Sequence, residues 1–167
     1  RWIYDPTPDF SYGLNIYLQY KNFDFSMFWQ GVQGVDVISD LKKETDLWSG
    51  LNIGFLNKGQ RLLDAWTPQN PTSSIPALSR SDLNNEKRVS TYFVENGSYL
   101  KMRNIQVGYI FPKSVTDKLH MSRLRLYVSA QNLLTIKSKS FTGVDPENAN
   151  FGYPIPVNLT FGLNINF

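Results

Sequence analysis

Residues 157–167 of the 167-residue sequence, VNLTFGLNINF, alternate strictly between apolar side chains and polar or small ones. The apolar members are Val157, Leu159, Phe161, Leu163, Ile165 and Phe167, and between them stand Asn158, Thr160, Gly162, Asn164 and Asn166. Successive side chains of a β-strand point to opposite faces, so this segment predicts a strand with one apolar and one polar face. The run is longer than an ordinary strand of about five or six residues.

Four further segments have the same period of two and are predicted to be strands. They cover residues 10–20, 23–31, 98–111 and 123–134. Only Lys21-Asn22 separates the first two, which predicts a tight hairpin. Near Arg103-Asn104 the phase of the alternation changes, which indicates either a β-bulge or a strand that rises out of an apolar zone.

The connections between the predicted strands are alternately short and long. Residues 21–22 and 112–121 are short connections, whereas residues 34–90 and 136–154 are long and polar. An up-and-down outer-membrane β-barrel has this arrangement, with short periplasmic turns and long extracellular loops. The one helical candidate in the long connections is GFLNKGQRLLDAW, in which Leu56, Leu62, Leu63 and Trp66 lie loosely on one side.

Alternation alone also fits a soluble β-sandwich, in which the apolar faces form a core. Aromatic side chains favour the membrane alternative, because they gather at the predicted periplasmic ends of the strands, as in an aromatic girdle. These residues are Tyr20, Phe23, Tyr109, Phe111 and Phe167. Five strands cannot close a membrane barrel, and open edges in hydrocarbon cost several kcal/mol per unpaired backbone group, so this interpretation requires a larger barrel.

The composition excludes several kinds of site. The chain has no Cys, and His120 is its single histidine, so we expect no disulfide, no two-histidine zinc site and no cofactor. Net charge is +3 and the cationic residues are scattered, which gives no stripe for binding nucleic acid. No pairing of nucleophile and base stands out, so we expect no enzymatic activity.

Six segments, in this order, resemble the C-terminal end of the SusC/RagA family of TonB-linked outer-membrane proteins of the Bacteroidetes. They are TPDFSYGLNIYLQYKNFDFSMFWQGVQG, LLDAWTPQNPTSSIP, NGSYLKMRNIQVGYIFP, SRLRLYVSAQNLLTI, FTGVDPE and YPIPVNLTFGLNINF. The resemblance covers almost the whole chain. It places residues 1–167 within one receptor barrel domain of about 22 strands, of which these are about five, in the outer membrane.

The resemblance also implies a function and partners. It implies TonB-dependent import of oligosaccharides or peptides together with a SusD-like surface lipoprotein that acts as a lid. The plug domain and the TonB box would lie outside this sequence, and the remaining partners would be outer-membrane lipid and the rest of the barrel. The alternative is a soluble all-β carbohydrate-binding module.

Four side chains of the predicted strand 123–134 share its polar face: Arg123, Arg125, Tyr127 and Gln131. In a barrel they would face the lumen, where they could line a substrate path, contact the plug by charge-assisted hydrogen bonds or form a general polar wall.

Three aromatic residues and one acidic pair complete the candidates. Trp48 and Trp66, in the long external loop, could bind substrate or a partner, or could pack the loop's own small core. Phe167 resembles the aromatic terminus that outer-membrane assembly machinery recognises. Asp145 and Glu147 could bind a hard cation through their carboxylate oxygens, but Asp-Pro also favours turns, and the turn is the preferred interpretation.

Overall fold

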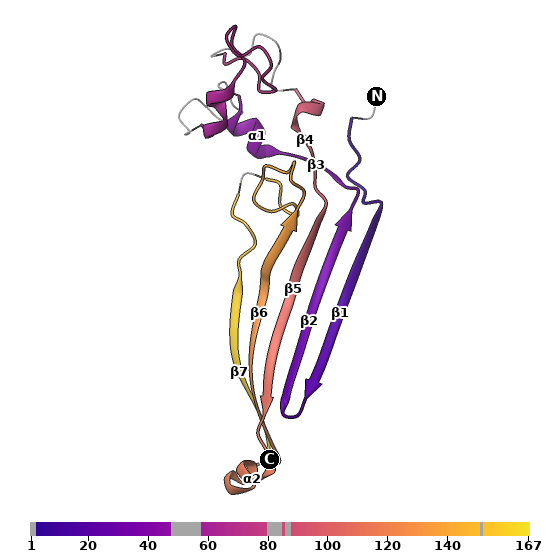
Figure 1. The fold of residues 1–167 in the computed structure, drawn as a ribbon, viewed down its shortest axis with the longest axis vertical. Coiled ribbons are helices and arrows are strands. Elements are labelled where there is room, and N and C mark those ends of the chain that lie inside the picture. Colours follow the sequence, from indigo (N-terminus) through magenta and orange to yellow (C-terminus); the bar gives the residue numbers. More distant parts are fainter. Residues whose placement is uncertain (1–2, 48–57, 80–84, 86–87, 151) are drawn as a thin grey trace. The chain divides into compact units, whose positions relative to one another are not determined.

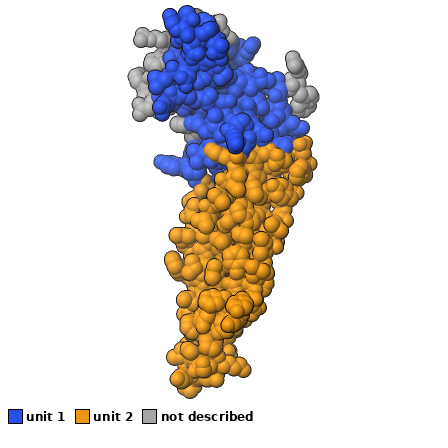
Figure 2. Space-filling view, in the orientation of Figure 1, with its two compact units in different colours: residues 1–8, 34–97, 138–154 blue, residues 9–33, 98–137, 155–167 orange. Residues whose placement is uncertain are grey.

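A computed structural model describes the chain apart from residues 1–2, 48–57, 80–84, 86–87 and 151. The chain forms two compact units, which Figure 2 colours separately. The sheet unit comprises residues 9–33, 98–137 and 155–167, and the loop unit comprises residues 1–8, 34–97 and 138–154. Each unit is therefore assembled from segments far apart in the sequence.

The sheet unit is one antiparallel sheet with the strand order β1-β2-β5-β6-β7 (Figure 1). Its strands are β1 (Phe10–Tyr20), β2 (Phe23–Gln33), β5 (Tyr99–Ile110), β6 (Arg123–Lys137) and β7 (Asn158–Asn166). All five predicted strands and their up-and-down order are confirmed. β6 extends three residues beyond the predicted end at Leu134, to Lys137.

Both short connections lie where the sequence predicted them. Lys21 has a left-handed φ of 52° in the two-residue turn between β1 and β2, which is the geometry that such tight hairpins need. Between β5 and β6 lie two short helices, α2 (Lys113–Thr116) and η3 (Asp117–Leu119). His120 ends η3 with a φ of 54° and is exposed.

Of the two alternatives for the change of phase near Arg103-Asn104, the structure has the β-bulge. On β2, Phe28 pairs with Asn104 and the next residue, Trp29, pairs with Met102, so Arg103 is an extra residue on β5. Because of the extra residue, the apolar positions of β5 change from even to odd numbers at the bulge. Their side chains still lie on one face, since Met102 is on the same face as its partner Trp29. The apolar face therefore continues without interruption along the strand.

The apolar face of the sheet is exposed. Phe161 and Leu159 of β7 keep 77% and 65% of their surface accessible, and in the described part of the chain no second layer covers them. A soluble sandwich would bury these side chains, so the sheet does not fit that alternative. Among the described residues, no helix is both long and apolar enough to cross a membrane.

Aromatic rings gather at the turn end of the apolar face, as predicted. Tyr20 pairs with Phe23 across the hairpin. The rings of Phe23 and Tyr109 have centroids 4.8 Å apart, and those of Tyr109 and Phe111 are 5.2 Å apart and edge-to-face. These contacts join β1, β2 and β5 in one aromatic band.

The loop unit contains short elements that the sequence analysis did not predict. They are β3 (Asp36–Ile38), α1 (Asp40–Thr45), η2 (Thr91–Phe93) and β4 (Val94–Asn96), and β3 pairs with β4. α1 begins with a side-chain cap, since the Lys42 amide donates to Ser39 Oγ at 3.3 Å. A helix of six residues is too short to show a hydrophobic period, which is why only its cap could have revealed it.

The predicted helix over 54–66 is partly wrong. In its described part only η1 (Gln60–Asp64), a 3-10 helix, is formed. Leu62 is buried with Ala65 and Ile75, whereas Leu63 is almost fully exposed, so these two leucines do not share one side.

Candidate functional site: the polar face of the sheet

The strand register places the four predicted lumen residues on one face. Along β6, Arg123, Arg125, Tyr127 and Gln131 pair in turn with Asn166, Asn164, Gly162 and Asn158 of β7. Every partner is polar or a glycine, so the polar faces of the two strands coincide. On the other side, β5 contributes Asn104 and Gln106 to the same face, next to Gln131 and Ser129.

Arg125 forms an ion pair that spans three strands. Its Nε donates to Oδ2 of Asp24 at 2.8 Å, and its second guanidinium nitrogen donates to the other oxygen of that carboxylate. Asp24 lies on β2, while Arg125 lies on β6, with β5 between them. Two parallel hydrogen bonds of this kind fix the orientation of both groups as well as binding them.

Gly108 of β5 makes this bridge possible. It lies directly beside Asp24 in the ladder, and a methyl group added there would collide with both the Arg125 guanidinium and the Asp24 carboxylate. The long arginine side chain therefore crosses β5 where that strand has no side chain. Arg125 was predicted as a site residue from the sequence, whereas Asp24 was not. The signal that could have revealed Asp24 is its position as an acidic residue on the polar face, next to the hairpin turn.

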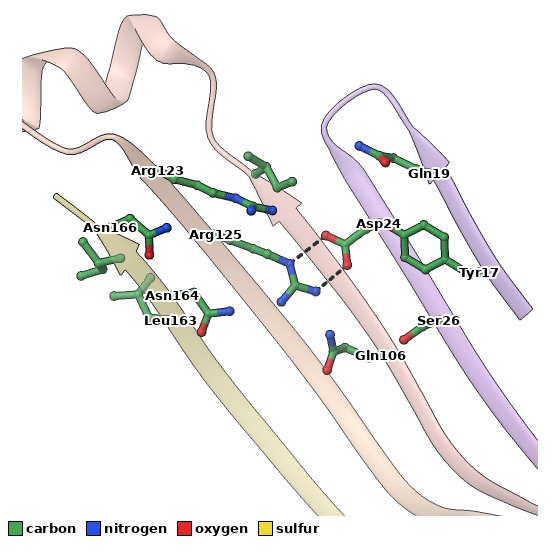
Figure 3. A pocket seen from close by; sticks show the side chains of 12 residues that line it. Tyr17, Gln19, Asp24, Ser26, Gln106, Arg123, Arg125, Leu163, Asn164 and Asn166 are labelled. Carbon is green, nitrogen blue, oxygen red and sulfur yellow. Dashed lines mark hydrogen bonds and ion pairs between the residues drawn. The ribbon is translucent and has the colours of Figure 1, made fainter. Parts of the chain in front are cut away.

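Around this pair the polar face is hollowed (Figure 3). The hollow has a volume of about 710 Å³ and is lined by Tyr17, Gln19, Asp24, Ser26, Gln106, Ile110, Arg123, Arg125, Leu163, Asn164, Ile165 and Asn166. Besides the Asp24 carboxylate, which is bound by Arg125, its polar groups are amides, hydroxyls and guanidinium groups, which form hydrogen bonds with polar molecules. The structure thus brings Arg123 and Arg125 together at one hollow, while Tyr127 and Gln131 lie further along β6.

The ring of Tyr127 contacts Arg125 on its own strand and Gly162 on the neighbouring strand β7. The Arg125 guanidinium carbon lies 5.1 Å from the centroid of the Tyr127 ring. The ring also covers Gly162, where an added methyl group would collide with it. A matching pair occurs on the apolar face, where the ring of Tyr12 covers its ladder partner Gly31. Aromatic rings laid over glycines in this way fill the gap that the missing side chain leaves.

The loop unit is organised around buried charges. The Glu95 carboxylate, which is almost fully buried, binds Lys42 Nζ at 2.9 Å and accepts hydrogen bonds from the amide and hydroxyl of Thr142. Asp46, also buried, accepts from the Tyr92 hydroxyl at 2.6 Å and pairs with Arg61 at 3.3 Å. This buried network joins segments from both long loops.

Tyr92 is held in its neutral form by this network. Burial, and then the hydrogen bond to Asp46, raise the pKa of the Tyr92 phenol above its usual range. The phenol therefore keeps its proton, and its hydrogen bond to Asp46, to a higher pH than an ordinary tyrosine does.

The remaining predicted site residues either do not line the hollow or fall outside the described residues. Trp66 lies in the loop unit, beside the buried cluster of Leu62, Ala65 and Ile75, and 42% of its surface is accessible. Its backbone amide donates to the Ile75 carbonyl at 2.9 Å. Trp48 falls outside the described residues. Phe167 directly follows β7 and is exposed.

Asp145 and Glu147 form the turn that the sequence analysis preferred. The Glu147 amide donates to Asp145 Oδ1 at 3.0 Å, and the Asn148 amide donates to the Asp145 carbonyl at the same distance. This is the self-bonding turn that Asp favours. Within the described part of the chain, no group of three or more potential metal-ligating side chains occurs.

Comparison with known proteins shows the family of the chain that forms this two-faced sheet. The chain is 35% identical to TonB-dependent receptor P3 of Formosa agariphila over 98% of its length, and 30% identical to TonB-dependent receptor SusC of Bacteroides thetaiotaomicron over all of it. The chain belongs to the SusC/RagA family of TonB-dependent receptors. It is an outer-membrane protein, and its relatives are receptors and transporters rather than enzymes. No family model matches the chain.

Solved structures of the RagAB peptide importer match the same fold. The chain aligns with the closed-closed state with a TM-score of 0.80 and 26% identity over 100% of its length, and with the open-open state with a TM-score of 0.78 and 28% identity over 96%. The sheet is therefore a fragment of a receptor barrel. The chain spans only 17% of receptor P3 and 16% of SusC.

Proposed function

We propose that this chain forms part of the wall of an outer-membrane importer, with its polar face along a water-filled passage and its apolar face against lipid. The observation that carries the proposal is the opposition of the two faces of one sheet. Exposed Phe161 and Leu159 lie on one face, and the Asp24–Arg125 bridge lies on the other. In a membrane barrel, lipid surrounds the first face and the polar lumen lies against the second.

The transported molecule is, on this proposal, an oligosaccharide or a peptide. The hollow offers the amides of Gln106 and Asn164, the hydroxyl of Ser26 and the guanidinium of Arg123. These groups suit the hydroxyls of a sugar as well as the amides and carboxylates of a peptide. Import takes place by gated passage, without bond chemistry. A SusD-like lipoprotein covers the outer side, and the TonB complex supplies energy through parts of the receptor outside this sequence.

Uptake by cells tests the proposal. The gene for the full-length receptor is deleted, and uptake of fluorescent oligosaccharides and peptides is measured before and after collapse of the proton-motive force. Loss of uptake of one class on deletion, with loss also on uncoupling, is the expected result. Unchanged uptake of both classes would contradict a role in nutrient import.

Complementation then tests the role of the polar face. Restoring the receptor as Arg123→Glu should reduce uptake several-fold, because it reverses a charge at the hollow. Lys139→Glu, an equal charge change at an exposed loop residue, is the matched control and should restore uptake fully. Equal uptake by both variants would place the substrate path away from this hollow.

We further propose that Trp66, and Trp48 in the same long loop, contact the lid or the substrate. Support comes from Trp66, whose side chain stays partly exposed although its neighbours form a small buried cluster. Large aromatic side chains often anchor interfaces. Trp66→Ala should weaken co-purification of the lipoprotein or uptake, whereas Trp66→Phe should largely preserve them. Unchanged co-purification and unchanged uptake in Trp66→Ala would exclude Trp66 as a contact.

A further inference from the structure

The turn end of the sheet has an excess of positive charge. Lys21 occupies the hairpin turn, and its ammonium lies 5.3 Å from the centroid of the Tyr20 ring. Lys113 and Lys118 are exposed in the longer turn that contains α2 and η3, where Asp117 is the single acidic residue between positions 112 and 122. We name Lys21, Lys113 and Lys118 the basic rim. Short turns of outer-membrane barrels face the periplasm, so the basic rim lies at that side.

Apolar side chains lie exposed among these cations. Val115 and Leu119, four residues apart in the longer turn, keep 37% and 49% of their surface accessible. In a turn surrounded only by water, the exposure of two aliphatic side chains beside two lysines would be unfavourable. The combination of cationic and apolar side chains is typical of segments that lie at a membrane surface.

The longer turn is continuous with the lipid-facing surface. Phe111, its last residue before Pro112, packs edge-to-face on Tyr109 of the aromatic band. The Phe111 amide donates to the Leu124 carbonyl at 2.9 Å, which ties both ends of the turn to the apolar face. Aromatic bands mark the level at which lipid head groups begin. The basic rim thus begins where head groups are expected.

We infer that the basic rim binds anionic phospholipid head groups of the leaflet that faces the periplasm. Val115 and Leu119 contact the boundary of the acyl chains, and the lysines reach the phosphates. Lysine suits this position because its long aliphatic stem packs on apolar surface while its ammonium stays in the polar layer. The charge of the rim is complementary to anionic lipid and gives no advantage for zwitterionic lipid.

Site-specific photo-crosslinking tests where the turn lies. The full-length receptor carries benzoylphenylalanine at position 119, or at position 114 as the control, because Ser114 is exposed in the same turn but is polar. Each protein is placed in nanodiscs of phosphatidylethanolamine with phosphatidylglycerol and irradiated. Phospholipid adducts several-fold more abundant at position 119 are expected. Adducts at 119 with the receptor's own chain alone, or no lipid adducts, would overturn the inference.

Lipid selectivity tests the role of the lysines. Native mass spectrometry of the full-length receptor should show preferential retention of phosphatidylglycerol over phosphatidylethanolamine. The triple variant Lys21→Gln, Lys113→Gln, Lys118→Gln should lose most of this preference, whereas the control variant Lys139→Gln should keep it. A triple variant with unchanged preference would overturn the inference. Neither readout depends on uptake, so the result stands apart from the proposed transport function.

Discussion

The two units of this chain differ in the side chains that they expose and in the interactions that hold them together. In the sheet unit, large apolar side chains such as Phe161 and Leu159 are exposed. In the loop unit, the carboxylates of Glu95 and Asp46 are buried and bound by several partners. The sheet is held by backbone ladders, which need no particular side chain, whereas the loops depend on a few side chains.

This contrast follows from what surrounds each unit. A strand in a membrane exposes apolar side chains to lipid at no cost, and its backbone must be fully paired. Long loops have little regular backbone pairing, so polar side chains must satisfy buried groups and fix the path of the chain. Mutations should therefore act differently in the two units: removal of one side chain should damage the loops, and addition of charge or bulk should damage the sheet.

The largest effect should come from Glu95→Ala. The substitution leaves Lys42 and the two donors of Thr142 without their shared acceptor, and breaking such a buried pair costs about 3–5 kcal/mol. Hydrogen exchange of the full-length receptor should show faster exchange in peptides from the loop unit, with the strands unchanged. Asp40→Ala, which breaks a more exposed pair with Lys43, is the matched control and should cost below about 1 kcal/mol. Similar exchange in both variants would show that the network does not hold the loops.

A smaller effect is expected from Phe161→Arg. This substitution puts a charge on the lipid face near the middle of β7, which costs roughly 2–4 kcal/mol in a membrane barrel. Thr160→Arg, one residue away on the polar face, should be mild. Urea unfolding of the full-length receptor in lipid vesicles measures both. Equal destabilisation by the two variants would contradict the assignment of the faces.

Gly108→Ala tests how the sheet tolerates added bulk on its polar face. A methyl group there displaces the Asp24–Arg125 pair, so we expect a loss of about 1–3 kcal/mol, typical of overpacking. Gly152→Ala is the control, because among the described residues no atom beyond the chain neighbours of Gly152 lies within 4 Å of the added methyl group. The same unfolding titration applies. A neutral Gly108→Ala would mean that the arginine reaches Asp24 by another path.

The smallest effect should come from Gly162→Ala, where the Tyr127 ring must rotate away. An off-rotamer side chain costs about 0.5–1.5 kcal/mol. The double variant with Tyr127→Ala should relieve this strain, so the two substitutions should not be additive. Additive losses in a double-mutant cycle would show that ring and glycine do not interact.

Much of the fold could be predicted because strands have a simple period. The strands containing Leu14 and Phe161 follow it without a break, and even the interruption at Arg103 was interpretable as a bulge. α1 and the β3–β4 pair could not be predicted, since they are too short to show a pattern. The same holds for the loop network: Glu95 and Thr142 lie 47 residues apart, and no local signal connects them.

For the candidate site, alternation alone was enough to predict which residues share the polar face, because it assigns faces directly. It identified Arg123, Arg125, Tyr127 and Gln131 in this way, together with the apolar face on the other side. That Arg125 binds Asp24 across Gly108, and that the hollow forms around this pair, became visible only in the folded sheet. The face on which a side chain lies depends only on whether its position in the strand is odd or even. Which side chains touch one another depends on the register between strands, and this register is fixed jointly by side chains and turns of distant segments.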